Sequence, residues 1–205
     1  MMRKYRIPWK DYFLLSVNPA IRFMVLSDFV WFGAAGLIVP IFALLVEDLI
    51  PGSTAATVGI AASIYLITKS VVQIFSASVI DWIRGEKDDF WVLFSFSIIG
   101  AFMPLAYLFM TTQMHLFIIQ FIYGICIAFT FPTFMAIFSR HLDAKKEGTE
   151  WGIYYTMNDL SSAFTAFAGG VIATLIGFKM LVLISVVVSI FGVLFLYPVR
   201  YYLYD

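Results

Sequence analysis

Three ionisable side chains interrupt otherwise apolar stretches of this chain: Asp28, Lys69 and Asp159. At the centre of a bilayer each would cost about 2.5–3.5 kcal/mol, so such residues normally face a protein interior or an aqueous pathway. A desolvated carboxylate can take up a proton near neutral pH, while a nearby ammonium group opposes that uptake. These three side chains could therefore bind protons, or a cationic or polar solute, reversibly.

The three charges are expected at one depth. With a rise of about 1.5 Å per residue, Asp28 lies about 12 Å from the inner end of its helix, and Asp159 is placed similarly on its own. Lys69 approaches from the other side and ends roughly 10–12 Å from the inner face of a core about 30 Å thick. A common depth would let the three side chains act on one solute.

Polar and aromatic residues extend these positions along helix faces. One stripe at helical spacing consists of Tyr65, Lys69, Gln73 and Ser76, and a second of Tyr155, Asp159 and Ser162 with Asn158 beside it. The predicted binding residues are Asp28, Trp31, Tyr65, Lys69, Gln73, Gln120, Tyr123, Tyr155, Asn158 and Asp159. Aromatic walls with carboxylates at the base suit an amphipathic solute, a sugar or an organic cation.

A structural alternative stays open for the same residues. Asp28 and Lys69 could form a buried pair that only pins two helices together, and Asp159 could be held by Asn158 and serines. The aromatic rings could likewise serve packing alone.

Membrane-spanning helices must position these side chains. Hydrophobic residues make up 62% of the 205 residues and charged residues 13%, with a mean hydropathy of +0.93. Soluble domains carry about 25% charged residues. Six apolar runs approach or exceed the roughly 20 residues that cross a bilayer: residues 29–46, 55–80, 90–111, 116–139, 160–178 and 180–199. They are too long and too uniformly apolar for barrel strands, so an all-α integral membrane protein with six transmembrane helices is predicted.

The distribution of positive charge predicts the orientation. Eleven of the 13 lysines and arginines lie on one side of the predicted membrane, and Lys179 alone lies on the other. By the positive-inside rule both termini face the cytoplasm, and the cell (inner) membrane is expected. Residues 1–19 are basic and aromatic and should lie along the inner interface, leaving residues 20–205 as the six-helix domain. A net charge of zero argues against nucleic acid as a partner.

Other local signals are structural. Asn18 followed by Pro19 is typical of a helix start, with Asn as the cap and Pro as the first helical residue. The single cysteine, Cys126, carries no disulfide information. No metal or cofactor is expected.

The chain also aligns with itself at an offset of 92 residues. Residues 29–31 (FVW) stand eleven residues before Pro40, and residues 121–123 (FIY) stand at the same spacing before Pro132. Gln120 then corresponds to Asp28. Because three helices are an odd number, the second copy must cross the membrane in the opposite sense. This predicts a 3+3 inverted repeat of about residues 20–112 and 113–200, an architecture found in transporters.

Local motifs point the same way. Residues 77–87 (ASVIDWIRGEK) resemble the loop between the second and third helices of the major facilitator superfamily, although Trp82 stands where a basic residue is usual. Residues 168–170 (AGG) and 177–179 (GFK) resemble the glycine-rich fifth helix of that family and the turn into its sixth. The resemblance implies a gating loop that contains Asp81, Arg84 and Gly85.

Family members ordinarily have twelve helices in two parallel halves, so the resemblance covers one half. It implies that the first and fourth helices line a cavity, the second and fifth contact the other half, and the third and sixth face lipid. Two copies inserted in the same orientation could associate by a two-fold axis along the membrane normal. The expected protein is a homodimeric secondary transporter of a small organic solute, working by alternating access and coupled to protons.

Three alternatives differ in kind. The chain could pair with a separate half-chain as a heterodimer, or it could be a non-transporting six-helix subunit or scaffold that binds a partner protein. An intramembrane protease would need a serine and a histidine within the membrane. His115 and His141 both lie at helix ends, and no Gly-x-Ser-x-Gly motif is present, so an enzyme is not expected.

Overall fold

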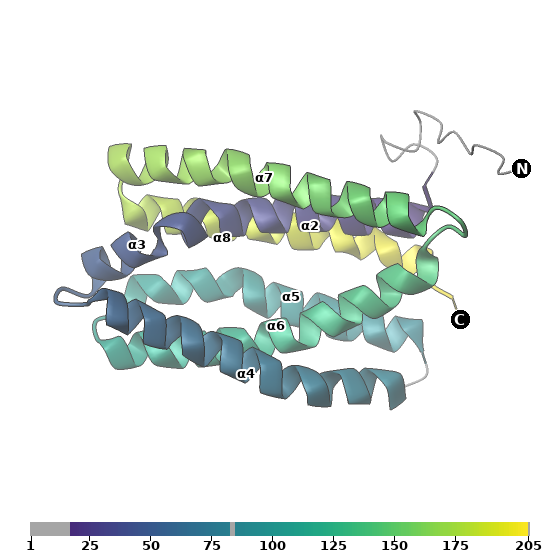
Figure 1. The fold of residues 1–205 in the computed structure, drawn as a ribbon, viewed down its shortest axis with the longest axis horizontal. Coiled ribbons are helices and arrows are strands. Elements are labelled where there is room, and N and C mark those ends of the chain that lie inside the picture. The colour runs from purple at the N-terminus through teal and green to yellow at the C-terminus, as the bar shows by residue number, and fades with distance from the viewer. Residues whose placement is uncertain (1–16, 83–84, 205) are drawn as a thin grey trace, which may run out of the picture.

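The computed structural model describes residues 17–82 and 85–204, which form a bundle of long helices (Figure 1). The long helices are α2 (Pro19–Ile38), α4 (Ala55–Trp82), α5 (Glu86–Ala106), α6 (Gln113–His141), α7 (Glu147–Leu175) and α8 (Phe178–Leu196). The shorter elements are η1 (Val39–Ile41), α3 (Phe42–Leu49), η2 (Tyr107–Phe109) and η3 (Tyr197–Tyr201). Among the described residues, five segments are long and apolar enough to cross a membrane, and α7 is of similar length but more polar. The predicted interfacial segment, residues 1–19, lies almost entirely outside the described residues.

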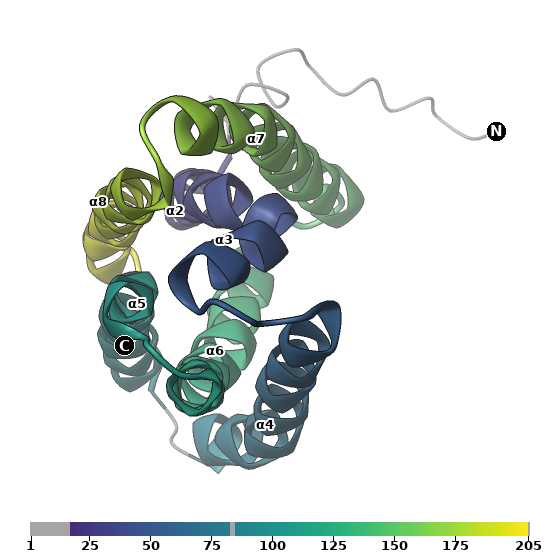
Figure 2. The same cartoon turned by 90° about the vertical axis from the view of Figure 1, so that its left-hand side faces the viewer.

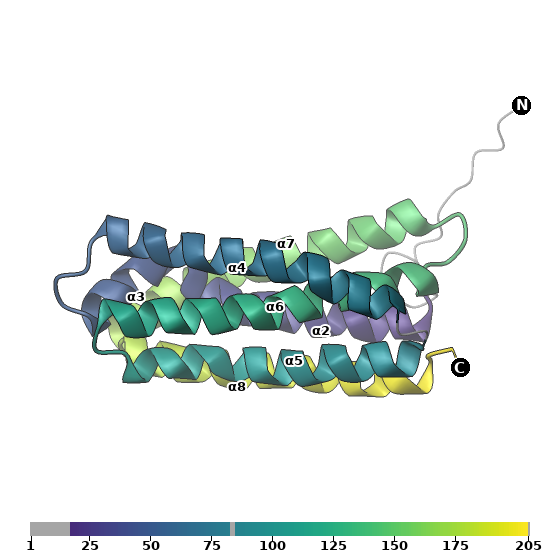
Figure 3. The same cartoon turned by 90° about the horizontal axis from the view of Figure 1, so that it is seen from below.

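The long helices form two groups, which lie apart in Figures 1 and 2, and in the view from below one group covers the other (Figure 3). Helix α2 packs against α7 and α8, while α6 packs against α4 and α5. The two groups meet along α5 and α8 and where α2 crosses α6. Seen along the bundle, α4 and α7 flank one side, and α5 and α8 lie together on the other (Figure 2). In both groups the first helix of one predicted repeat packs between the second and third helices of the other.

The predicted start of the first helix is confirmed. Helix α2 begins at Pro19, and the Asn18 Oδ1 accepts a hydrogen bond of 2.9 Å from the Ala20 backbone N–H. Near the far end, Pro40 lies in the 3-10 turn η1 that separates α2 from α3. Proline cannot donate the backbone hydrogen bond that would continue α2, so the helix breaks there.

Helix α7 differs most from the predicted apolar run. The run began at residue 160, whereas the helix begins at Glu147. Polar residues such as Asn158 and Asp159 interrupt the run of hydrophobicity but are compatible with helical backbone, so apolarity alone placed the start too late. The helix ends at Leu175, two residues before Gly177, whose φ of +92° strongly favours glycine.

Small residues let α2 and α7 approach closely. A Cβ added to Gly33 would lie 2.6 Å from the Ser161 hydroxyl, and one added to Gly36 would lie 3.0 Å from the Ser162 Cα. A Cβ on Gly169 would collide with the backbone of Leu37. Such contacts, which exclude any side chain larger than hydrogen, fix the spacing of membrane helices where no hydrophobic driving force acts between them.

A polar cluster ties the helix ends together at the end of the bundle that carries Asn18 and Tyr204. The Arg140 guanidinium donates to Asp89, which is only 2% exposed, over 2.7 Å. Glu86 accepts a 2.8 Å hydrogen bond from the Tyr204 backbone N–H. The His141 ring packs on the Tyr204 ring with centroids 4.7 Å apart. These contacts hold the C-terminal segment against α5 and α6.

We expect Arg140→Gln to lower the free energy of unfolding by about 1–3 kcal/mol, because it leaves the buried Asp89 carboxylate without its described partner. The measurement is the thermal unfolding midpoint in detergent, with Lys179→Gln as a control that removes an exposed cation from the opposite end. Equal midpoints for the two variants would contradict the expectation.

Candidate functional site

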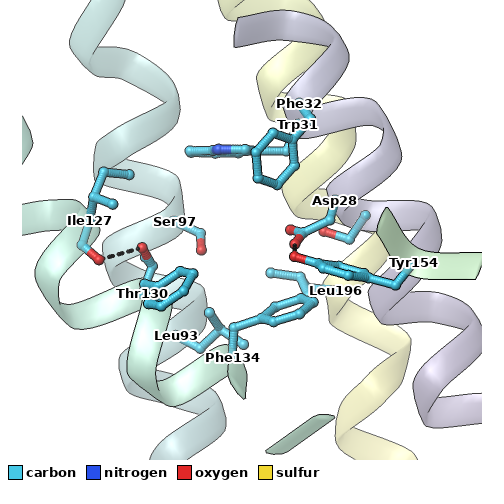
Figure 4. Close-up of a pocket in the computed structure, with 12 residues that line it drawn as sticks. Asp28, Trp31, Phe32, Leu93, Ser97, Ile127, Thr130, Phe134, Tyr154 and Leu196 are labelled. Atoms are coloured by element: carbon cyan, nitrogen blue, oxygen red, sulfur yellow. Dashed lines mark hydrogen bonds between the residues drawn. The ribbon is translucent and has the colours of Figure 1, made fainter. Parts of the chain in front are cut away.

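A cavity of about 90 Å³ lies between the two helix groups. Its lining comes from α2, α5, α6, α7 and α8: Ser27, Asp28, Trp31, Phe32, Leu93, Ser97, Ile127, Thr130, Phe131, Phe134, Tyr154 and Leu196. Asp28 and Tyr154 approach from one side, and Ser97 and Thr130 lie on the other (Figure 4). Most of the remaining lining is apolar, so Asp28 is the ionisable carboxylate of this cavity. The volume has room for a few water molecules.

Within the described part of the chain, one directed hydrogen bond holds the Asp28 side chain. The Tyr154 hydroxyl of α7 donates to the Asp28 carboxylate over 2.7 Å (Figure 4). The neighbouring Ser27 hydroxyl donates to the Gly192 carbonyl of α8 over 2.9 Å, which fixes the rotation of α2 about its axis. A carboxylate with a single donor keeps open lone pairs toward the cavity. It can therefore accept a proton or a donor group of a solute there.

Trp31 spans the cavity from α2 to α5. A Cβ added to Gly100 of α5 would lie 3.2 Å from the Trp31 indole, so glycine makes room for the ring. On α6, the Thr130 hydroxyl donates back to the Ile127 carbonyl over 3.2 Å (Figure 4). Ser97 is 5% exposed and adds a hydroxyl to the same wall.

Lys69 lies behind one wall of the cavity. Its ammonium stands 4.8 Å from the centroid of the Phe131 ring, and Phe131 itself lines the cavity. Among the residues that the structure describes, Lys69 and Asp28 form no ion pair. The structural alternative, in which Asp28 and Lys69 only hold two helices together, requires this ion pair and is therefore not supported by the described residues.

The other eight predicted binding residues, Lys69 included, lie outside the lining of this cavity. Tyr65 and Tyr123 pack with ring centroids 5.5 Å apart, and the Gln120 amide donates to the Tyr107 hydroxyl over 3.4 Å. These residues do not line the cavity that contains Asp28.

On α7, the Asn158 side chain is 5% exposed, and its amide finds no hydrogen-bond partner within the geometric limits among the described residues, whereas Tyr155 is 56% exposed and Asp159 is exposed beside it. Gln73 is half-buried on α4. Of the ten predicted residues, Asp28 and Trp31 line the cavity.

The predicted gating loop is described in part. Asp81 is exposed in the last turn of α4, and Gly85 directly precedes α5 in an extended conformation with φ of −176°. Arg84 lies outside the described residues.

Sequence reasoning missed Tyr154, which is 3% exposed and bonded to Asp28. Tyr154 begins a second polar stripe, which runs one residue before the predicted stripe of Tyr155, Asp159 and Ser162. Tyr154, Asn158 and Ser161 also recur at helical spacing, and all three belong to the buried face of α7. The Ser161 hydroxyl donates to the Phe29 carbonyl of α2 over 2.6 Å, which confirms which face meets α2.

The comparisons with known proteins agree with this architecture. The family model described as Major Facilitator Superfamily matches residues 24–202. The chain belongs to that superfamily, whose members are membrane transporters rather than enzymes. The predicted all-helical membrane fold and the resemblance to the family are confirmed.

Among solved structures, the in meso crystal structure of the POT family transporter PepTSo matches with a TM-score of 0.68 at 14% identity. The match covers 91% of this chain and 38% of that one, so this chain spans well under half the length of its structural relative. The likeness shows that the two share a fold. None of the curated proteins compared with the chain matches it.

Proposed function

We propose that this chain is half of a secondary transporter that moves a small organic solute by alternating access, with proton exchange at Asp28. The observation that carries the proposal is the Asp28–Tyr154 hydrogen bond, which faces a cavity between the two helix groups. A carboxylate in such a position is costly and marks a functional site by default, and carboxylates are a common element of proton relays in transporters. The sugar, drug-like and organic-cation classes remain the proposed solutes because Trp31 supplies an aromatic face beside the carboxylate.

The size of the cavity indicates that one copy does not complete a solute site. Pockets for organic ligands measure roughly 300–1,000 Å³, whereas this cavity measures about 90 Å³. It can therefore hold water and exchange a proton, but an organic solute needs a further wall. A second six-helix unit would supply that wall.

The surfaces of α4 and α7 are where the second unit would bind. The apolar part of α4 is only 11% buried, less than that of any other candidate spanning segment among the described residues. Ile74 on α4 and Phe164 on α7 are 70% and 75% exposed. The same helices carry the partly or fully exposed Lys69 and Asp159. A copy in the same orientation would bring these polar residues into one interior, as the two halves of a longer family member do.

The direction of insertion is part of the proposal. The first described residues and the last lie at the same end of the bundle (Figure 1), as an even number of crossings requires. In each group the first helix of one predicted repeat packs against the second and third helices of the other repeat. Because this packing is the same for both predicted repeats, it supports an inverted repeat. We place this end in the cytoplasm and the protein in the cell membrane on the basis of the charge distribution.

Cysteine cross-linking in the bilayer tests the homodimer. In a Cys126→Ala background, we expect Ile74→Cys and Phe164→Cys to cross-link to a species of twice the 23.2 kDa chain mass. The control is Phe191→Cys on α8, which is 58% exposed but lies on the side proposed to face lipid. Cross-linking of the control with equal yield, or monomers that still transport, would overturn the homodimer.

Two rivals give different results in the same preparation. A heterodimer requires a separate half-chain, different from this one, in the cross-linked product. A scaffold that binds a partner protein forms its complex but shows no solute uptake in liposomes. The uptake assay therefore separates the transporter from the scaffold, and the mass of the cross-linked species separates the two kinds of dimer.

A further inference from the structure

Lys69 and Asp159 are opposite charges on the two helices of the proposed dimer surface, α4 and α7. Lys69 is partly exposed and Asp159 is exposed. Among the residues that the structure describes, neither side chain forms an ion pair. A charge in the middle of a membrane helix is costly, and such residues usually pair with one another. Both charges are therefore open to a partner from outside the chain.

The long helices around these two residues supply no counter-charge at their level. Helix α6, which packs against α4, contains no Asp or Glu. On α4 itself, Asp81 lies about 18 Å further along the helix, at about 1.5 Å per residue. The cations of α2 and α8, which pack against α7, are Arg22 and Lys179, and both lie near the ends of their helices. Neither Lys69 nor Asp159 is thus neutralised within its own helix group.

Lys69 and Asp159 lie at nearly the same depth in the bundle. Helices α4 and α7 both reach the end of the bundle that lies opposite the last described residues (Figure 1). At about 1.5 Å per residue, Lys69 lies about 21 Å from the Ala55 end of α4, and Asp159 lies about 24 Å from the Leu175 end of α7. The long lysine side chain can span the difference.

A two-fold axis along the bundle brings the two residues together between copies. Seen along the bundle, α4 and α7 lie at the two edges of one side (Figure 2). Half a turn about an axis beside that side exchanges the two edges, so α4 of one copy faces α7 of the other. Every residue keeps its depth in this rotation, and an isologous interface makes each contact twice. Lys69 of each copy then meets Asp159 of the other.

We propose that Lys69 of each copy forms an ion pair with Asp159 of the other, so that two such pairs hold the homodimer across the surface of α4 and α7. The inference rests on the proposed homodimer and adds the chemistry by which one copy recognises the next. Charge complementarity selects a second copy as the occupant of this surface. Because an unpaired charge in low-dielectric surroundings is costly, the pairs favour the assembled state and fix which residues of α4 and α7 face one another.

Charge exchange between two differently labelled chains tests the proposal. Lys69→Asp gives a chain with two acidic residues on this surface, and Asp159→Lys gives a chain with two basic ones. Neither should form a homodimer in liposomes, as measured by Förster resonance energy transfer between labelled copies over a range of protein-to-lipid ratios. The two chains mixed together should form a heterodimer with about the wild-type affinity, because both ion pairs are restored with their signs reversed.

Neutral variants keep the test informative if a charge-reversed chain does not fold. Lys69→Gln and Asp159→Asn should each weaken the homodimer at least about 30-fold, the effect of leaving a desolvated charge without its partner. The matched controls are Lys179→Asp and Asp48→Lys, which make the same charge changes at exposed positions on α8 and α3 and should leave the affinity unchanged. The unfolding midpoint of each variant, measured beside the affinity, separates loss of the dimer from loss of the fold.

Three results would overturn the proposal: a wild-type chain that stays monomeric, no association of the two charge-exchanged chains with each other, or a homodimer whose affinity Lys69→Gln leaves unchanged. The last result removes the ion pair and leaves the homodimer standing. Solute uptake is measured separately in the same liposomes. A dimer that depends on Lys69 and Asp159 but takes up no solute would support the ion pair and refute the transporter.

Discussion

Asp28→Asn should reduce uptake driven by a proton gradient by roughly 5- to 150-fold, the range that corresponds to a coupling free energy of about 1–3 kcal/mol. Asn has nearly the same shape and can still accept the hydrogen bond from Tyr154, so the fold and the cavity are retained. The substitution removes the ability to exchange a proton. The measurement is solute uptake into liposomes with and without an imposed pH gradient.

The design separates coupling from binding. If Asp28 couples the solute to protons, exchange of labelled for unlabelled solute across the membrane should survive in Asp28→Asn, because exchange needs no net proton movement. If Asp28 binds the solute directly, exchange is lost as well. The matched control is Asp48→Asn, which neutralises an exposed carboxylate on α3 at the far end of the bundle. Undiminished gradient-driven uptake by Asp28→Asn would contradict the role proposed for this residue.

Gly169→Ala should destabilise the protein by about 1–3 kcal/mol through overpacking. The added methyl group collides with the backbone of Leu37 on α2, and backbone atoms of a packed helix cannot rotate away as a flexible side chain can. The measurement is the thermal unfolding midpoint in detergent, where each kcal/mol corresponds to about 2–4 °C for a chain of this size.

The next residue provides the control. Gly170 lies on the same helix, but no atom lies within 4 Å of a Cβ placed there. Gly170→Ala should therefore be neutral or slightly stabilising, since Ala favours the helix over Gly by roughly 0.5–1 kcal/mol. Equal effects at the two positions would show that the close approach of α2 and α7 does not contribute to stability.

Some features of the protein are local properties of the chain, and the sequence alone determined these. Hydrophobicity over about 20 consecutive residues predicts a crossing whatever the neighbours are, because the bilayer acts as the solvent. The start of α2 at Asn18 and Pro19 depends on two adjacent residues and was also predicted. Asp28 could be selected because a carboxylate is costly in any membrane segment.

The tertiary structure alone decided which face of each helix points inward. On α7, two stripes one residue apart carry the same kinds of side chain: Tyr155, Asp159 and Ser162, and Tyr154, Asn158 and Ser161. Helical spacing cannot choose between them. Packing does, because the Ser161 side chain lies against Gly33 of α2 and the Thr165 side chain lies against Gly36, and these close contacts set the rotation of α7. That rotation brings Tyr154 to Asp28 and leaves Tyr155 on the outside, since a contact between residues 126 positions apart depends on how two helices pack rather than on either helix alone.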